Sequence, residues 1–188
     1  RRRLNPMHIA TGNGASTGPL VDYCAEIPAK RAALRAAYDR FPGDAGFDAF
    51  CAAEGEALTL FALHQALSDR HGALWTDWPA ALQTPQTAME HASAGDIRYH
   101  AWLQWRAHQQ LCAAQDALQG AGMAYGLYLD LAVGTHPSGA ETWAEPQWFA
   151  HGVSLGAPPD PFSPDGQRWA LAPFDPHALI RGHFAALA

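Results

Sequence analysis

Asp130 is the residue whose type and position first suggest chemistry in this chain. It lies near the end of an almost continuous apolar run, Met123 to Val133, which predicts a strand covered on both faces in a parallel sheet. Functional groups in β/α barrels stand at the carboxyl ends of such strands. A carboxylate there can accept hydrogen bonds from sugar hydroxyls or hold a neighbouring catalytic group, or it can simply brace the loop that follows.

The long loop after this run combines aromatic and polar side chains in a way that suits a sugar. Sugar rings pack their C–H faces on aromatic rings, while carboxylates and amides bind their hydroxyls. Asp160, Gln167 and Arg168 carry suitable polar groups. We expect three of the five aromatics to anchor the loop and Phe162, at the proline-flanked tip, to stay exposed. The five are Trp143, Trp148, Phe149, Phe162 and Trp169.

Other kinds of catalytic or binding site lack their sequence patterns. The ten histidines show no H-E-x-x-H, no H-x-H and no cluster with cysteine, so we expect no metal site. The run TGNGASTG neither follows a strand nor opens a helix with lysine, which argues against phosphate binding.

Charge and cysteine content narrow the class of protein and its compartment. A formal net charge of -6 leaves no basic face to neutralise phosphates, so nucleic-acid binding is not expected. No apolar run reaches the roughly 20 residues that a membrane span needs, and no signal peptide is visible. Three widely spaced cysteines without C-x-x-C indicate reduced thiols, and we expect a cytoplasmic protein.

Apolar periodicity and turn residues predict a helix-rich chain with one good strand. Helices are expected at 28–41, 48–70, 97–119, near 144–150 and from 175 to the end. Pro28 opens the first of these helices, and Asp96 caps the third. On the third helix, Tyr99, Trp102 and Trp105 have a helical spacing that favours a place in the core over a sugar-binding platform.

A single parallel strand cannot make a sheet. Either the protein is α-rich with an odd buried strand, or the sheet partners lie outside the chain. The order of helix, strand and helix over 96–188 is that of one β/α barrel unit, preceded by a helical insertion. We expect an N-terminal extended segment and helical insertion subdomain over 1–95, and a helix–strand–long loop–helix unit over 96–188. The expected fold class is α/β: a helix-rich fragment of a (β/α)8 TIM barrel with a mostly helical inserted subdomain.

Long and unusual motifs connect the chain to a known family. They are YHAWLQWRAHQQLCAAQDALQGAGMAYGLYLD, GLYLDLAVGTHPSGAETW, VSLGAPPDPFSPDGQRWALAPFDPHAL and the opening RRRLNPMHIA. Together they resemble glycoside hydrolase family 77, the 4-α-glucanotransferases, also called amylomaltases or disproportionating enzymes. The resemblance implies a barrel enzyme that cleaves α-1,4-glucan with retention and passes the sugar to the 4-hydroxyl of another glucan. It also implies that two carboxyls do this chemistry without a metal or organic cofactor.

The resemblance further implies which residues take part. In the family the nucleophile is the aspartate of an Arg-Ile-Asp-His motif on the next strand, and the acid/base is a glutamate on a later strand. Neither motif occurs here, so we expect no catalytic residue in the chain and place both carboxyls beyond Ala188. A strand-end aspartate and a loop that lies over the glucan do carry over, with Pro161 where many relatives have an aromatic or aliphatic residue. The implied substrate-binding residues are Asp130, Asp160, Phe162, Gln167 and Trp169.

These observations predict part of a cytoplasmic 4-α-glucanotransferase that binds maltooligosaccharides and needs the remainder of the barrel for activity. The chain has no initiator methionine at its start, which indicates a piece of something longer. Two alternatives belong to other classes. One is a non-catalytic glucan-binding module that holds glucan through Phe162 and Trp169. The other is a helical interaction scaffold, whose exposed strand edges and apolar faces would make it associate.

Overall fold

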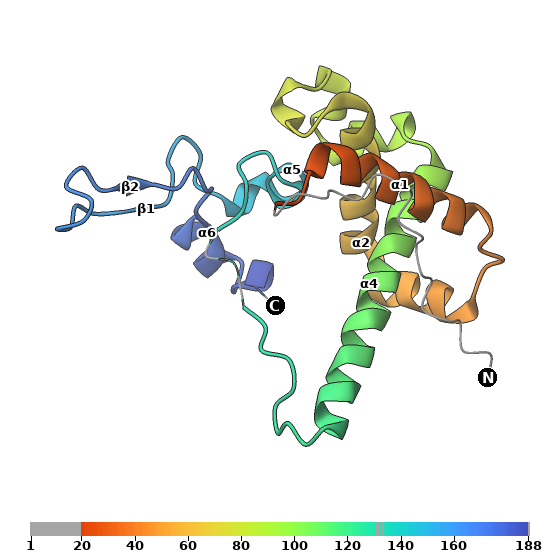
Figure 1. Cartoon of the computed structure of the whole chain (residues 1–188). Helices are drawn as coiled ribbons and strands as arrows, with labels where there is room; N and C mark the ends of the chain where they lie inside the picture. The colour runs from red at the N-terminus through yellow and green to blue at the C-terminus, as the bar shows by residue number, and fades with distance from the viewer. Residues whose placement is uncertain (1–19, 131, 133, 188) are drawn as a thin grey trace. The chain divides into compact units, whose positions relative to one another are not determined.

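The chain consists of two compact units, Arg1–Ala45 and Gly46–Ala188. The computed structural model describes residues 20–130, 132 and 134–187 (Figure 1). The predicted boundary between residues 95 and 96 stays a prediction. The larger unit contains all the candidate site residues, and its elements are therefore the ones that position the site.

The first helix, α1 (Tyr23–Asp39), begins earlier than Pro28. Asp22 caps it, because its side chain accepts hydrogen bonds from the backbone N–H groups of Cys24 at 3.0 Å and Ala25 at 3.2 Å. Pro28 therefore lies inside the helix, and the prediction that it opens the helix was wrong. The aspartate is the stronger start signal here because it satisfies donors that would otherwise lack partners.

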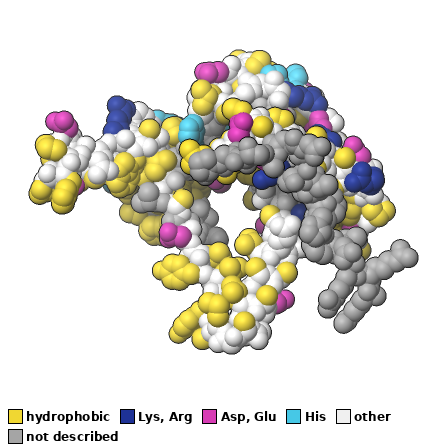
Figure 2. All heavy atoms as spheres, in the orientation of Figure 1, with side chains coloured by type: hydrophobic (Ala, Val, Ile, Leu, Met, Phe, Trp, Pro, Cys, Tyr) yellow, Lys and Arg dark blue, Asp and Glu magenta, His cyan; other side chains and the backbone are white. Residues whose placement is uncertain are grey.

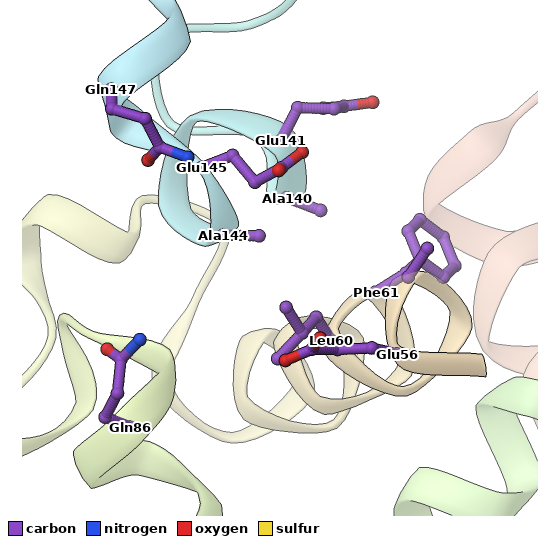
Figure 3. Close-up of a pocket in the computed structure, with 10 residues that line it drawn as sticks. Glu56, Leu60, Phe61, Gln86, Ala140, Glu141, Ala144, Glu145 and Gln147 are labelled. Atoms are coloured by element: carbon purple, nitrogen blue, oxygen red, sulfur yellow. The ribbon is translucent and has the colours of Figure 1, made fainter. Parts of the chain in front are cut away.

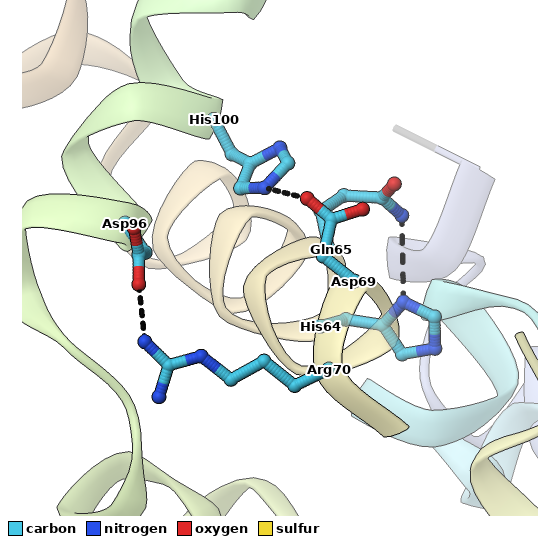
Figure 4. Close-up of polar contacts among 6 residues, drawn as sticks. All are labelled: His64, Gln65, Asp69, Arg70, Asp96 and His100. Atoms are coloured by element: carbon cyan, nitrogen blue, oxygen red, sulfur yellow. Dashed lines mark hydrogen bonds and ion pairs between the residues drawn. The ribbon is translucent and has the colours of Figure 1, made fainter. Parts of the chain in front are cut away.

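Two long helices form the frame of the larger unit, α2 (Ala45–His71) and α4 (Ala94–Gly120). Two polar contacts between these helices appear in Figure 4. Arg70 pairs with Asp96, and a ring nitrogen of His100 lies 3.1 Å from the carboxylate of Asp69. The predicted cap of the third helix was wrong, because α4 starts at Ala94 and Asp96 lies in its first turn. The carboxylate of Asp96 is directed to another helix instead.

The aromatic side chains of α4 lie in the core. Tyr99 is 5% exposed, and Trp102 and Trp105 are each 6% exposed. The ring of Trp105 packs on Phe47 of α2 with the ring centroids 5.4 Å apart. The prediction of a core role over a sugar platform is confirmed.

Short helical turns follow α2 and close over its buried face. They are η1 (Trp75–Asp77), η2 (Ala80–Leu82), α3 (Pro85–Ala88) and η3 (Met89–His91). Their apolar residues join those of α2 and a tryptophan from much later in the chain. The resulting core cluster consists of Leu63, Leu67, Trp78, Leu82, Ala88 and Trp143.

Trp143 is the largest fully buried side chain of this cluster, at 1% exposure. Its indole N–H donates to the backbone carbonyl of Leu82 at 2.9 Å. The neighbouring Thr142 hydroxyl accepts from the indole N–H of Trp75 at 3.2 Å. Burial of an indole whose N–H has a partner ties the later part of the chain to the helical frame.

The strand predicted over 123–133 is absent from the described part of that range. Residues 123–130 instead run as an extended segment with exposed side chains, including Tyr125 at 91% and Tyr128 at 96%. Figure 2 shows hydrophobic side chains gathered where this segment follows α4. The amide of Gln115 takes the place of a strand partner, donating to Tyr125 O at 3.1 Å and accepting from Leu127 N at 2.7 Å. A strand needs a neighbouring backbone, and an apolar run alone does not supply one.

The last part of the chain contains more β-type pairing than the sequence predicted. Its elements are α5 (Ala140–Ala144), η4 (Pro146–Trp148), β1 (Gly156–Ala157), β2 (Gln167–Arg168), α6 (Pro176–Arg181) and η5 (Ala185–Leu187). The helix predicted near 144–150 is thus two shorter turns. The last helix begins as predicted at Asp175, whose side chain accepts from His177 N at 2.8 Å, but it ends at Arg181 and does not continue to the end of the chain as predicted. Within the described residues, no helix is both long and apolar enough to cross a membrane.

His64 of α2 is enclosed by the same aromatic core. It is 4% exposed, and its ring centroid is 5.1 Å from that of Trp78 and 5.5 Å from that of Trp143. Its Nδ1 lies 3.4 Å from the amide nitrogen of Gln65 (Figure 4). Burial lowers the pKa of His64 to about 4, against the opposing effect of Glu141, so the ring is neutral at pH 7.

Truncation of Trp143 tests the central packing contact. We expect Trp143→Ala to lower the free energy of unfolding by about 3–5 kcal/mol, because a large buried ring leaves a cavity. Trp143→Phe should cost about 1–3 kcal/mol, because the carbonyl of Leu82 loses its donor. Urea unfolding measures both changes. Phe162→Ala removes an exposed ring and is the control, expected within about 0.5 kcal/mol of the parent; equal losses for Trp143→Ala and this control would contradict the assignment.

Acid should destabilise the fold through His64. The unfolded chain protonates this histidine near pH 6.5 and the folded chain only near 4, so stability falls as the pH drops through that window. Thermal unfolding between pH 7 and 4 measures the fall. His64→Leu should flatten the pH dependence, whereas His177→Leu, at an exposed site, should not. An unchanged slope in His64→Leu would refute the contribution of His64.

Candidate functional site

Four of the five predicted substrate-binding residues lie together on one β-hairpin arm. The arm spans residues 155–169, with Gly156 paired to Arg168 and Ala157 to Gln167 in an antiparallel register. It extends from the body at the end marked β1 and β2 in Figure 1. The four residues are Asp160, Phe162, Gln167 and Trp169.

Backbone hydrogen bonds fix the base of this arm. Leu155 donates to Leu171 O at 3.0 Å and accepts from Trp169 N at 3.0 Å. Beyond the arm, the strand-like path continues, with Ala172 donating to Thr135 O and Ala150 donating to Pro173 O, each at 2.9 Å. The arm therefore grows out of a hydrogen-bonded base and is not an unattached loop.

Two consecutive tight turns shape the tip of the arm. In the first, Asp160 and Ser163 exchange backbone hydrogen bonds, from Asp160 N to Ser163 O at 3.1 Å and from Ser163 N to Asp160 O at 3.2 Å. Pro161 occupies the second position of this turn, which proline favours. In the second turn, Gly166 N donates to Ser163 O at 2.9 Å.

The side chain of Asp160 is part of the first turn. Its Oδ1 accepts from the backbone N–H of Phe162 at 2.8 Å and of Ser163 at 2.7 Å. The Ser163 hydroxyl braces the second turn by donating to Gly166 O at 2.9 Å. Both turns have recognisable sequence signals, Asp-Pro-Phe-Ser and Ser-Pro-Asp-Gly, from which they could have been predicted.

The two aromatic rings of the arm differ in their surroundings. Phe162 is 97% exposed, as expected for the tip. Trp169 is 43% exposed, and its indole N–H donates to Oε1 of Gln167 at 2.9 Å. Gln167 thus orients Trp169, and both rings are accessible to a ligand with apolar faces.

The other three aromatics anchor the region, as the sequence predicted. Trp143 lies in the core, and Phe149 is 6% exposed and stacks on Phe174 with ring centroids 4.9 Å apart. Trp148 is half-buried, and its indole N–H donates to Glu145 Oε1 at 3.1 Å. These contacts hold the base from which the arm projects.

Asp130 stands apart from the arm. It lies in the extended segment after α4 and is exposed. Its predicted role in substrate binding therefore stays a prediction.

A cavity with a volume of about 460 Å³ lies elsewhere, between α2, α3 and α5 (Figure 3). No sequence pattern indicates this cavity, because the residues that line it come from three distant segments. Two of its carboxylates are engaged locally, Glu141 by the Thr135 hydroxyl at 2.8 Å and Glu145 by Trp148. Its lining residues include Glu56, Leu60, Phe61, Gln86, Glu141 and Glu145.

Metal-binding groups do not gather in the part of the chain that the structure describes. There, no set of three or more His, Cys, Asp or Glu side chains is placed to hold a metal ion. One pair of possible ligands lies on α4, with His108 Nε2 3.6 Å from Cys112 Sγ. Two exposed ligands on one helix fall short of the four that a structural zinc site uses.

A family model and a curated protein that resemble this chain have the same description. The model of the family described as 4-alpha-glucanotransferase (Glyco_hydro_77) matches residues 4–188. A 4-alpha-glucanotransferase of Mycobacterium tuberculosis is 43% identical over 194 residues, which cover 98% of this chain and 26% of the relative. The chain therefore spans about a quarter of the length of that curated relative.

Two solved structures resemble the chain. An amylomaltase from Corynebacterium glutamicum has a TM-score of 0.67 and 32% identity, over 84% of this chain and 21% of that one. An amylomaltase from Streptococcus agalactiae in complex with acarbose has a TM-score of 0.76 and 18% identity, over 89% of this chain and 36% of that one. At the lower identity the likeness concerns the fold alone.

Gly166 should be essential to the shape of the arm. Its φ is +72°, and an added Cβ would lie 2.7 Å from Ala157 O, so Gly166→Ala combines backbone strain with a clash. Gly152→Ala is the matched control, with φ of +77° but nothing within 4 Å of the added Cβ. We expect Gly166→Ala to speed hydrogen exchange at Trp169 N–H, which donates to Leu155 O, by about tenfold or more. Equal exchange in the two variants would contradict the close packing.

Proposed function

The chain belongs to the 4-alpha-glucanotransferase family, and from this premise we propose that it is part of an enzyme that transfers α-1,4-glucan segments between maltooligosaccharides. The observation that carries the proposal is the hairpin arm, whose braced tip presents the 97%-exposed ring of Phe162. A large exposed aromatic on a structured arm has a physical use when a ligand with apolar faces covers it. A glucan chain is such a ligand.

The arm is proposed to form one wall of the glucan-binding groove. Phe162 and Trp169 offer ring faces to the C–H faces of glucose units, and nearby carboxylate and amide groups bind hydroxyls. The proposed substrate-binding set comprises Asp130, Asp160, Phe162, Gln167 and Trp169, in which Asp160 contributes through the turn that carries Phe162. The support is the clustering of four of them on the arm and the family membership of the chain.

The catalytic step is proposed to use carboxyls that the 188 residues do not contain. Retention requires one carboxylate to attack the anomeric carbon and a second carboxyl to protonate the leaving oxygen, and then to activate the acceptor. The acceptor is the 4-hydroxyl of another glucan. Because both groups come from the protein, the reaction needs no metal or organic cofactor.

The surrounding fold is proposed to be a (β/α)8 barrel in the cytoplasm. Residues 96–188 would contribute one unit of it, and 1–95 an extended segment and part of a helical insertion. In the whole barrel the extended segment after α4 would gain neighbours on both sides, which would cover the exposed Tyr125 and Tyr128 and bring Asp130 to the groove. The amylomaltase structures that resemble the chain support this proposal.

An interaction scaffold is the second candidate, because the same exposed apolar segment would suit a protein partner. Tyr125, Tyr128 and Leu129 are 91%, 96% and 77% exposed. If the chain is a scaffold, the 188 residues should form a complex of defined size, and substitutions in the hairpin arm should not change sugar binding. Size exclusion at several concentrations, with and without maltooligosaccharide, separates the two candidates.

Incubation with maltotriose tests the proposed function. The full-length protein should release glucose and form longer oligosaccharides, whereas the 188 residues alone should give no turnover, because they lack the catalytic pair. Product analysis by chromatography measures both. Robust turnover by the 188 residues alone would show that the catalytic carboxyls lie within them. No turnover by the full-length protein would remove the proposed activity.

A further inference from the structure

We infer that Asp160 is a positioning residue: its carboxylate holds a preformed turn that presents Phe162 to the glucan, and Asp160 does not itself contact the sugar. The inference rests on the proposed glucan-binding role of the arm and deepens it. The arm would then contain residues that contact the ligand and residues that hold the contacting residues in position.

The hydrogen bonds of Asp160 favour this role. One oxygen, Oδ1, accepts from two successive backbone N–H groups, those of Phe162 at 2.8 Å and Ser163 at 2.7 Å. A carboxylate that accepts from backbone donors makes shorter and stronger hydrogen bonds than a neutral acceptor. One of these donors belongs to Phe162 itself, so the carboxylate directly restrains the backbone that carries the ring.

The neighbouring residues restrict the same backbone further. Pro161 and Pro164 each have a fixed φ and follow the first residue of the two successive turns. Gly166 closes the second turn with φ of +72°, a conformation that residues with a side chain rarely adopt. The Ser163 hydroxyl adds a hydrogen bond to Gly166 O at 2.9 Å. The tip is thus shaped by the chain before any ligand binds.

Phe162 needs such support because its ring has almost no packing of its own. At 97% exposure, contacts with the body cannot set the place of the ring, so the turn sets it. Ordering a loop during binding reduces affinity, and a loop already ordered avoids that loss. The expected result is that Asp160 affects glucan binding only as long as Phe162 is present.

Hydrogen exchange tests the turn without reference to activity. In the full-length protein without sugar, Asp160→Ala should speed exchange of the Phe162 and Ser163 N–H groups by about tenfold, as expected for the loss of one hydrogen bond. Asp160→Asn should change it much less, because asparagine also closes such turns. Asp165→Ala, in the same loop but with an exposed side chain, is the control. Exchange in Asp160→Ala equal to that in the control would overturn the inference.

A double-mutant cycle tests the link to the glucan. In the full-length protein, Asp160→Ala and Phe162→Ala should each raise KM for maltotriose, by about tenfold. In the Phe162→Ala background, Asp160→Ala should change KM less than about twofold, because residues acting as a unit are not additive. Asp165→Ala should leave KM unchanged in both backgrounds.

The outcomes separate this inference from the proposed function. Additive effects of the two substitutions would mean that Asp160 contacts the sugar directly, which overturns the inference while the transferase activity stands. An unchanged KM in Phe162→Ala would also overturn it. If the full-length protein had no transferase activity, the proposed function would fail, and the exchange experiment would still decide whether Asp160 holds the turn.

Discussion

The burial of Trp143 is the contact on which the larger unit depends. Its indole enters the core formed by α2 and the short turns after it, packs against His64 and Trp78, and donates to Leu82 O. The residues it joins are far apart in the sequence, since Trp143 and Leu82 are separated by 61 positions. Thr142, the preceding residue of α5, is 4% exposed and adds a hydrogen bond from the indole N–H of Trp75. These contacts attach α5, and with it the base of the arm, to the helical frame.

A series of contacts connects Trp143 and α5 to the tip of the arm. Phe149 packs on Phe174, and the backbone pairs 150 with 173 and 155 with 171 connect the anchored base to the arm. The hairpin continues the pairing, and the two turns end it. Each step is short and hydrogen-bonded, so the rigidity of the helical core extends to an exposed tip. A binding surface on a loop gains precision when the scaffold below it is fixed in this way.

The sequence predicted the helices and the division of the aromatics well, because both depend on local pattern. Apolar spacing placed α2 and α4 to within a few residues and put Trp102 and Trp105 in the core, and the proline-flanked tip indicated the exposure of Phe162. In the described part of 123–133 the predicted strand is absent, because an apolar run specifies a buried environment while a strand also requires a neighbouring backbone. The binding role predicted for Asp160 stays a prediction, while the hydrogen bonds of its side chain within the turn follow from the local Asp-Pro pattern, which is typical of turns. The cavity beside Glu141 could not be predicted, because tertiary contacts alone bring its walls together.

A crystal structure of the full-length protein with a bound maltooligosaccharide would show directly which residues of the arm contact the sugar. We expect the Phe162 ring to pack on the face of a glucose unit while Asp160 Oδ1 still accepts from the backbone N–H groups of Phe162 and Ser163. Trp169, held by Gln167, should lie on the same side of the glucan. A sugar bound by the Asp160 carboxylate with Phe162 left in solvent, or bound away from the arm altogether, would contradict the account.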